Sequence, residues 1–123
     1  MTEKANKDRP VLFGAGILGF AGVAAAAASA HAAGDPQMMS AVALVCLTHA
    51  PALLALGLSG RHDFLLRLAA LLLFVGAALF SIDIALRVFG HGPLFAMAAP
   101  TGGVTMLAGW LAVAISAFTP RRS

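Results

Sequence analysis

Charged residues are scarce in this 123-residue sequence. Asp, Glu, Lys and Arg make up 11% of it, against about a quarter in soluble globular proteins. Hydrophobic residues make up 60%, and the mean hydropathy is +0.91. These values exclude an ordinary soluble domain and indicate a membrane protein. The period-2 alternation of barrel strands is absent. Cys46 is the only cysteine, which excludes an intramolecular disulfide.

Long uncharged runs show where the chain crosses the membrane. Residues 11–34, 36–60 and 88–120 contain no Asp, Glu, Lys or Arg, and each run exceeds the roughly 18 residues of a spanning candidate. A fourth candidate, 64–88, is interrupted only by Arg67, Asp83 and Arg87. Lipid cannot satisfy free backbone groups, so these segments should be helices. We expect helices over residues 11–33, 38–59, 64–88 and 102–119, with tails at 1–10 and 120–123.

The links between these segments are short, except for the outer loop from Phe89 to Thr101. Short links place consecutive helices side by side and antiparallel. The predicted fold class is therefore an all-α membrane protein, with one up-down-up-down bundle of four transmembrane helices over residues 11–119.

Basic residues predict the orientation. The net charge is +3 and the pI is near 10, but the positions of the charges argue against nucleic acid as a partner. With four spans, one side of the membrane holds seven Lys and Arg residues, and the other holds Arg87 alone. The positive-inside rule then predicts that both termini are cytoplasmic, in a bacterial inner membrane. The seven are Lys4, Lys7, Arg9, Arg61, Arg67, Arg121 and Arg122.

The first apolar segment imitates a secretory signal, because basic residues precede it and Ala28-Ser29-Ala30 resembles a cleavage site. The run is long for a signal peptide, so we expect an uncleaved first transmembrane helix.

Small residues recur at steps of three and four in two of the predicted helices. Such seams let membrane helices approach closely, so we expect them to join the first helix to the fourth or to another subunit. The glycines of Gly14-Ala15-Gly16-Ile17-Leu18-Gly19 match a dinucleotide fingerprint, but no strand precedes them, so we interpret them as packing residues. The predicted packing residues are Ala15, Gly19, Gly22, Ala26, Gly102, Gly103, Gly109 and Trp110, and the seams also include Ser29, Thr105, Ala112 and Ser116.

Asp83 and Arg87 stand four residues apart near the outer end of the third predicted helix, where both side chains share one face and can pair. Asp83 lies only about 8 Å below the membrane boundary, and Arg87 can extend to the headgroups. We expect that Asp83 and Arg87 form an ion pair that anchors the outer end of this helix at the membrane surface. A functional acid in a water-filled vestibule is the alternative.

His49 lies near the middle of the second predicted helix. A histidine at this depth is a candidate proton relay or ligand. The interpretation that we prefer is a neutral imidazole, hydrogen-bonded across the bundle to Thr105 or Ser81. Trp110 lies within the fourth segment, where its indole N–H requires an acceptor.

His31 and Asp35 are expected at the outer end of the bundle, with Asp83 and His91. Imidazole and carboxylate groups suit zinc or copper, which makes a metal site at the outer face an alternative, although no tight ligand spacing such as H-x-x-x-H occurs. We expect no cofactor.

Several landmarks together resemble the YgdD-like family of small four-span membrane proteins, a domain of unknown function found in bacteria and in organisms with mitochondria. The resemblance implies a membrane location and this topology, but no reaction. Asp83 stands where the family more usually has a serine, so the Asp83–Arg87 pair is a peculiarity of this chain. The landmarks are Ala30-His31, Thr48-His49-Ala50, Gly76 with Leu79-Phe80-Ser81, Ala99-Pro100-Thr101-Gly102-Gly103 and Gly109-Trp110-Leu111.

The sequence thus predicts a small integral membrane protein that is not an enzyme. We expect an accessory, assembly or interaction subunit whose surroundings are the lipid bilayer and whose partner is a membrane-protein complex or a second copy of itself. One alternative is a small transporter or proton-coupled exporter that uses His49 and Asp83. The other is the metal-binding protein described above.

Overall fold

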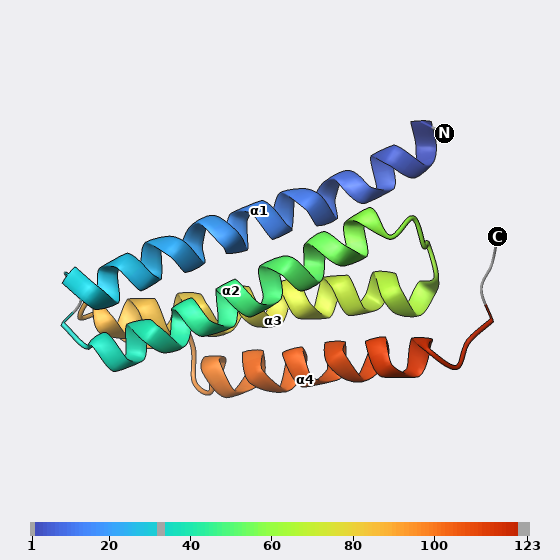
Figure 1. Ribbon diagram of the computed structural model, residues 1–123. Coiled ribbons are helices and arrows are strands. Elements are labelled where there is room, and N and C mark those ends of the chain that lie inside the picture. Colours follow the sequence, from blue (N-terminus) through green and yellow to red (C-terminus); the bar gives the residue numbers. More distant parts are fainter. Residues whose placement is uncertain (1, 32–33, 121–123) are drawn as a thin grey trace.

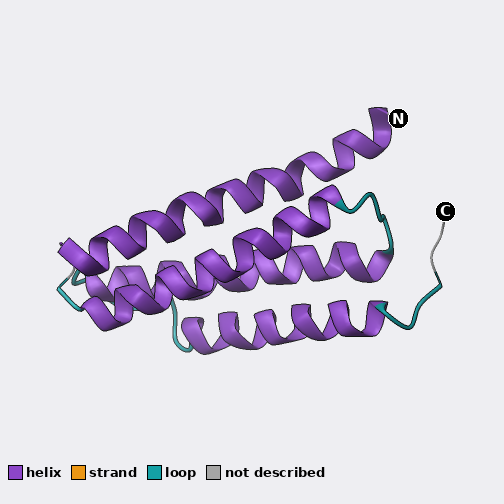
Figure 2. Ribbon diagram, in the orientation of Figure 1, coloured by secondary structure: helices purple, strands orange, loops and turns teal. Residues whose placement is uncertain are grey.

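Four antiparallel helices make up the part of the chain that the structure describes, as predicted. The computed structural model describes residues 2–31 and 34–120, and side chains from residue 8 onward within these ranges. The helices are α1 (Thr2–His31), α2 (Pro36–Leu58), α3 (Phe64–Val88) and α4 (Ala98–Ser116) (Figure 1). All four are long and apolar enough to cross a membrane. The described ranges contain no strand (Figure 2). The protein is therefore an all-α four-helix bundle of the membrane type.

Three helices begin earlier than the apolar pattern predicts, and α2 does so by only two residues, at Pro36 instead of 38. α1 starts at Thr2 instead of residue 11, because the hydrophobic boundary marks the membrane edge, whereas the polar segment before it consists largely of good helix formers. α4 covers Ala98–Ser116 instead of 102–119. Pro100 is tolerated there because the amides of the first helical turn have no partner within the helix. Residues 32–33 and 121–123, which the predicted ranges include, lie outside the described part.

Local signals explain where the other helices start and stop. Asp35 caps α2 by accepting a hydrogen bond from Met38 N at 3.1 Å, and Pro36 occupies the first turn. α3 ends in a Schellman motif at Gly90, which has φ 87°. In this motif Gly90 N donates to Arg87 O, and His91 N donates to Leu86 O.

The helices pack in an order that separates the first from the last. α1 packs mainly against α2, α2 also packs against α3, and α3 packs against α4 (Figure 1). In the described part of the chain, no Cα atom of α1 lies within 8 Å of one in α4. The predicted contact between the first and fourth helices is therefore wrong, because α2 and α3 lie between them. The core lies around Cys46, Leu53, Leu73 and Ala77.

Candidate functional site

A hydrogen bond between His49 of α2 and Trp110 of α4 crosses the middle of the bundle. Trp110 Nε1 lies 3.1 Å from His49 Nε2, and the two rings meet edge to face at 5.6 Å. His49 is 8% exposed, whereas Trp110 is 42% exposed. Among the described residues, no Cα atom of α2 lies within 8 Å of one in α4. The side-chain pair therefore connects two helices that α3 otherwise separates.

The partners of His49 determine its tautomer. The indole N–H of Trp110 can only donate, so His49 Nε2 must be the accepting nitrogen. The proton of the neutral imidazole is then on Nδ1, which donates to Val45 O at 2.8 Å. Thr48 Oγ1 also lies 3.1 Å from Nδ1. Both ring nitrogens are thus used within the protein.

The predicted partners of His49 are wrong, because both have other partners. Ser81 Oγ lies 3.3 Å from Cys46 Sγ, a contact between α3 and α2 in the core. Thr105 Oγ1 donates to Thr101 O of its own helix at 2.7 Å. A hydroxyl that binds its own backbone needs no partner on a neighbouring helix.

Asp83 is fully buried, with an exposed fraction of 0%, and its carboxylate accepts two hydrogen bonds. One comes from Arg87 Nε at 3.1 Å, one turn further along α3, and the other from the backbone of Leu94 at 2.8 Å. Leu94 belongs to the loop between α3 and α4. Asp83 therefore attaches this loop to α3, while the partly exposed Arg87 compensates its charge.

The other residues of the predicted outer cluster do not join Asp83. His31 and His91 are exposed, and Asp35 caps α2. Across the residues that the structure describes, no three His, Cys, Asp or Glu side chains come close enough to share a metal ion. This arrangement does not favour the metal-binding alternative.

The small residues of the fourth helix lie against α3. A Cβ atom placed on Gly102 would lie 2.7 Å from Phe80 N and 2.8 Å from Gly76 O, closer than real Cβ atoms approach. A Cβ atom on Gly109 would similarly meet Leu73 at 2.8 Å. Gly103 differs, because a Cβ atom there would meet nothing within 4 Å, so Gly103 makes no close helix contact within the described part of the chain.

Glycines of the first-helix seam lie against α2. A Cβ atom on Gly22 would lie 2.7 Å from the Leu47 side chain. Gly19 is in ordinary contact range of Ala50. Ala15 is buried in the core, and Ala26 packs against its edge. Both seams are therefore used within the chain.

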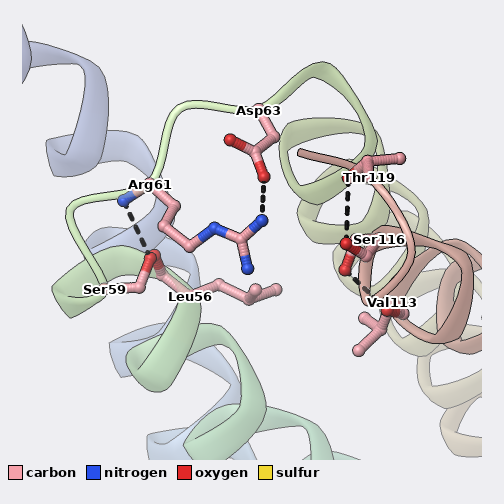
Figure 3. A network of polar contacts seen from close by, with 7 residues as sticks. All are labelled: Leu56, Ser59, Arg61, Asp63, Val113, Ser116 and Thr119. Carbon is pink, nitrogen blue, oxygen red and sulfur yellow. Dashed lines mark hydrogen bonds and ion pairs between the residues drawn. The ribbon is translucent and has the colours of Figure 1, made fainter. Parts of the chain in front are cut away.

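Sequence reasoning missed a second polar cluster, at the α2–α3 turn. Figure 3 shows the Arg61 side chain reaching Asp63, to which it donates a hydrogen bond, while Arg61 N donates to Ser59 Oγ. His62 Nδ1 lies 3.8 Å from Asp8 Oδ1 of α1. The sequence shows only three consecutive polar residues at a turn, which is a weak signal for a cluster. It does not show that Asp8 approaches His62, because that contact depends on how α1 packs.

A model of the family described as "Protein of unknown function (DUF423)" matches residues 24–103, about two thirds of the chain. The chain belongs to this family. The match includes His31, His49 and Asp83 and ends within the first turns of α4. Neither the curated proteins nor the solved structures contain a match to the chain.

Proposed function

We propose that this small membrane protein is a non-catalytic accessory or assembly component of a membrane-protein complex. On this proposal it acts through its surface and not through a reaction in its interior. Its interior polar groups connect helices and loops to one another.

The observation that carries the proposal is that these groups already have partners within the chain. Both ring nitrogens of His49 are used, one by Trp110 and one by Val45 O. The carboxylate of Asp83 is buried and binds Arg87 and the Leu94 backbone. A proton relay or substrate site needs groups that can exchange partners, whereas here exchange would break contacts that hold α4 and its loop in place.

We expect a partner to contact the exposed surface of the outer helices. α1 and α4 flank the bundle on opposite sides (Figure 1) and expose large apolar side chains, including Phe20 at 80% and Leu107 at 70%. We propose that both termini lie on the cytoplasmic side of a bacterial inner membrane. The segments that would then be cytoplasmic contain seven of the eight Lys and Arg residues of the sequence.

Crosslinking in native membranes tests the proposal. Single cysteines replace Phe20 on α1 and Leu107 on α4 in a Cys46→Ala background, and a cysteine at the buried Ala69 is the matched control. We expect a product of one discrete mass from at least one outer position and none from the control. If neither outer position yields a discrete product, no partner contacts α1 or α4 at these positions, which contradicts the proposal.

A flux assay distinguishes the proposal from transport. The wild type and His49→Ala are reconstituted in liposomes that contain a pH-sensitive dye, and a proton gradient is applied. We expect both proteins to leave the rate of proton leakage at the level of empty liposomes. Flux through the wild type that His49→Ala abolishes would show that the protein is a transporter and would contradict the proposal.

A further inference from the structure

A cleft of about 790 Å³ opens between α1 and α3, at the end of the bundle that contains the α2–α3 turn. Its walls are mostly apolar, and α2 contributes two leucines to them. Phe13 and Leu71, on its two sides, are exposed and therefore in contact with the bilayer in a membrane. The apolar residues that matter here are Phe13, Gly14, Leu53, Leu56, Leu71 and Phe74.

One end of the cleft is closed by a contact between α1 and α3. A Cβ atom on Gly14 would lie 3.0 Å from the ring of Phe74, and both residues line the cleft. From Phe64, near the turn, to Phe74 the α3 wall is about 15 Å long at the helical rise per residue. The cleft is therefore an elongated apolar slot with a closed inner end and a mouth at the turn.

The mouth carries polar groups with unused hydrogen-bonding capacity. Arg61 and His62 line it, and among the described residues their Nε and Nε2 atoms are buried without any hydrogen-bond partner. Arg67 also lines it, is exposed, and forms no ion pair with any residue that the structure describes. The two carboxylates at this place already have partners, since Asp63 binds Arg61 and Asp8 faces His62.

The sequence around the mouth is basic as a whole. Among the side chains that the structure describes, this end of the bundle carries three arginines, Arg9, Arg61 and Arg67, but only two carboxylates, Asp8 and Asp63. A ligand headgroup at this end meets an excess of positive charge. An anionic headgroup is therefore favoured over a zwitterionic one.

We propose that the cleft binds one molecule of an anionic phospholipid. Its phosphate lies at the mouth, where it accepts hydrogen bonds from Arg61 Nε and from the Arg67 guanidinium. One acyl chain lies in the slot between α1 and α3, which it enters sideways from the bilayer between Phe13 and Leu71. Guanidinium N–H groups suit phosphate oxygens in charge and geometry, and the apolar walls suit the chain.

Native mass spectrometry of the full chain in a nonionic detergent tests this site. The protein is titrated with phosphatidylglycerol, phosphatidylcholine or inorganic phosphate. Arg67→Gln removes an exposed cation from the mouth, and Arg9→Gln removes another exposed cation from the same end of the bundle, at a residue that does not line the cleft. Leu71→Trp fills the slot from its exposed edge, and Leu107→Trp adds the same side chain to the outer face of α4.

We expect the wild type to bind phosphatidylglycerol more tightly than phosphatidylcholine. Arg67→Gln should weaken phosphatidylglycerol binding at least about fivefold, as the loss of a charge-assisted hydrogen bond does, and Arg9→Gln less than about twofold. Leu71→Trp should weaken it and Leu107→Trp should not. Equal effects of the two arginine variants, or equal affinity for the two lipids, would overturn the proposal. Displacement of the lipid by millimolar inorganic phosphate would also overturn it, since the site would then take a free anion.

Discussion

Trp110 donates its indole N–H to Nε2 of His49 at 3.1 Å, and this bond connects α4 to α2 across the bundle. The bond gives each residue what it needs in an apolar medium. The indole gains an acceptor, and the imidazole is held in the tautomer with its proton on Nδ1, because Nε2 must keep the lone pair that Trp110 binds. Trp110 is the only tryptophan of the chain, so tryptophan fluorescence reports on this residue alone.

Removal of the donor should loosen α4. Trp110→Phe keeps an aromatic ring but leaves His49 Nε2 without its partner, and hydrogen bonds between membrane helices contribute about 1 kcal/mol. We expect the free energy of unfolding, measured in mixed micelles, to fall by about that amount. In the background of His49→Leu, the same substitution should have less than half of this effect. Equal effects in both backgrounds would show that the ring, not the bond, contributes the stability.

Neighbouring glycines should respond in opposite ways to one added methyl group. Gly102→Ala places a Cβ atom against the Phe80 and Gly76 backbones, which cannot move without separating α3 from α4. We expect a loss of about 2 kcal/mol. Gly103→Ala meets nothing within 4 Å, so the better helix propensity of alanine should leave stability unchanged or raise it by about 0.5 kcal/mol. Thermal unfolding in detergent measures both variants, and a reversed order would contradict the described packing of α3 and α4.

Asp83 should act mainly on the loop between α3 and α4. Asp83→Ala leaves the Leu94 amide without its acceptor and Arg87 without its counter-ion, and we expect the free energy of unfolding to fall by about 2 kcal/mol. Asp83→Asn retains an oxygen for Leu94 and should lose about half as much. Limited proteolysis within residues 89–97 should be faster in Asp83→Ala than in Asp83→Asn. Equal cleavage rates in these two variants and the wild type would show that the carboxylate does not hold the loop.

The predicted orientation is open to a labelling experiment. In a Cys46→Ala background, one cysteine replaces Ser59 at the α2–α3 turn and another replaces Gly92 in the opposite loop, where both positions are exposed. A membrane-impermeant maleimide applied to intact bacteria should label the cysteine at 92 but not the one at 59. Both should react after the cells are permeabilised. Labelling of only the cysteine at 59 in intact cells would place both termini outside.

The number of helices was predictable because charge is scarce and its few positions separate the apolar runs. The need of His49 and Trp110 for polar partners was predictable for the same reason, since each stands in an apolar run. Their pairing was not, because it depends on how α2 and α4 are rotated about their own axes. The role of Gly102 in close packing was predictable from its spacing, but its partner helix was not.

Other features depend on tertiary contacts between distant residues. The bond from Leu94 N to Asp83 joins residues on either side of a helix end, and a sequence pattern shows only that Arg87 is near. Gly103 continues the small-residue pattern but faces open space, because one residue along a helix turns the side chain by about 100°. The cleft requires α1 and α3 to diverge from their contact at Gly14 and Phe74, and no local signal encodes that divergence.

His49 and Trp110 bind one another inside the bundle, and the proposed function depends on such internal pairing. The most direct test is ¹⁵N NMR of the histidines in protein reconstituted in lipid bilayers, with His49→Gln used to assign the His49 signals. We expect the proton of His49 on Nδ1, and an Nε2 signal that shifts when Trp110 is replaced by Phe. A proton on Nε2, or a signal that does not respond to Trp110→Phe, would contradict this pairing.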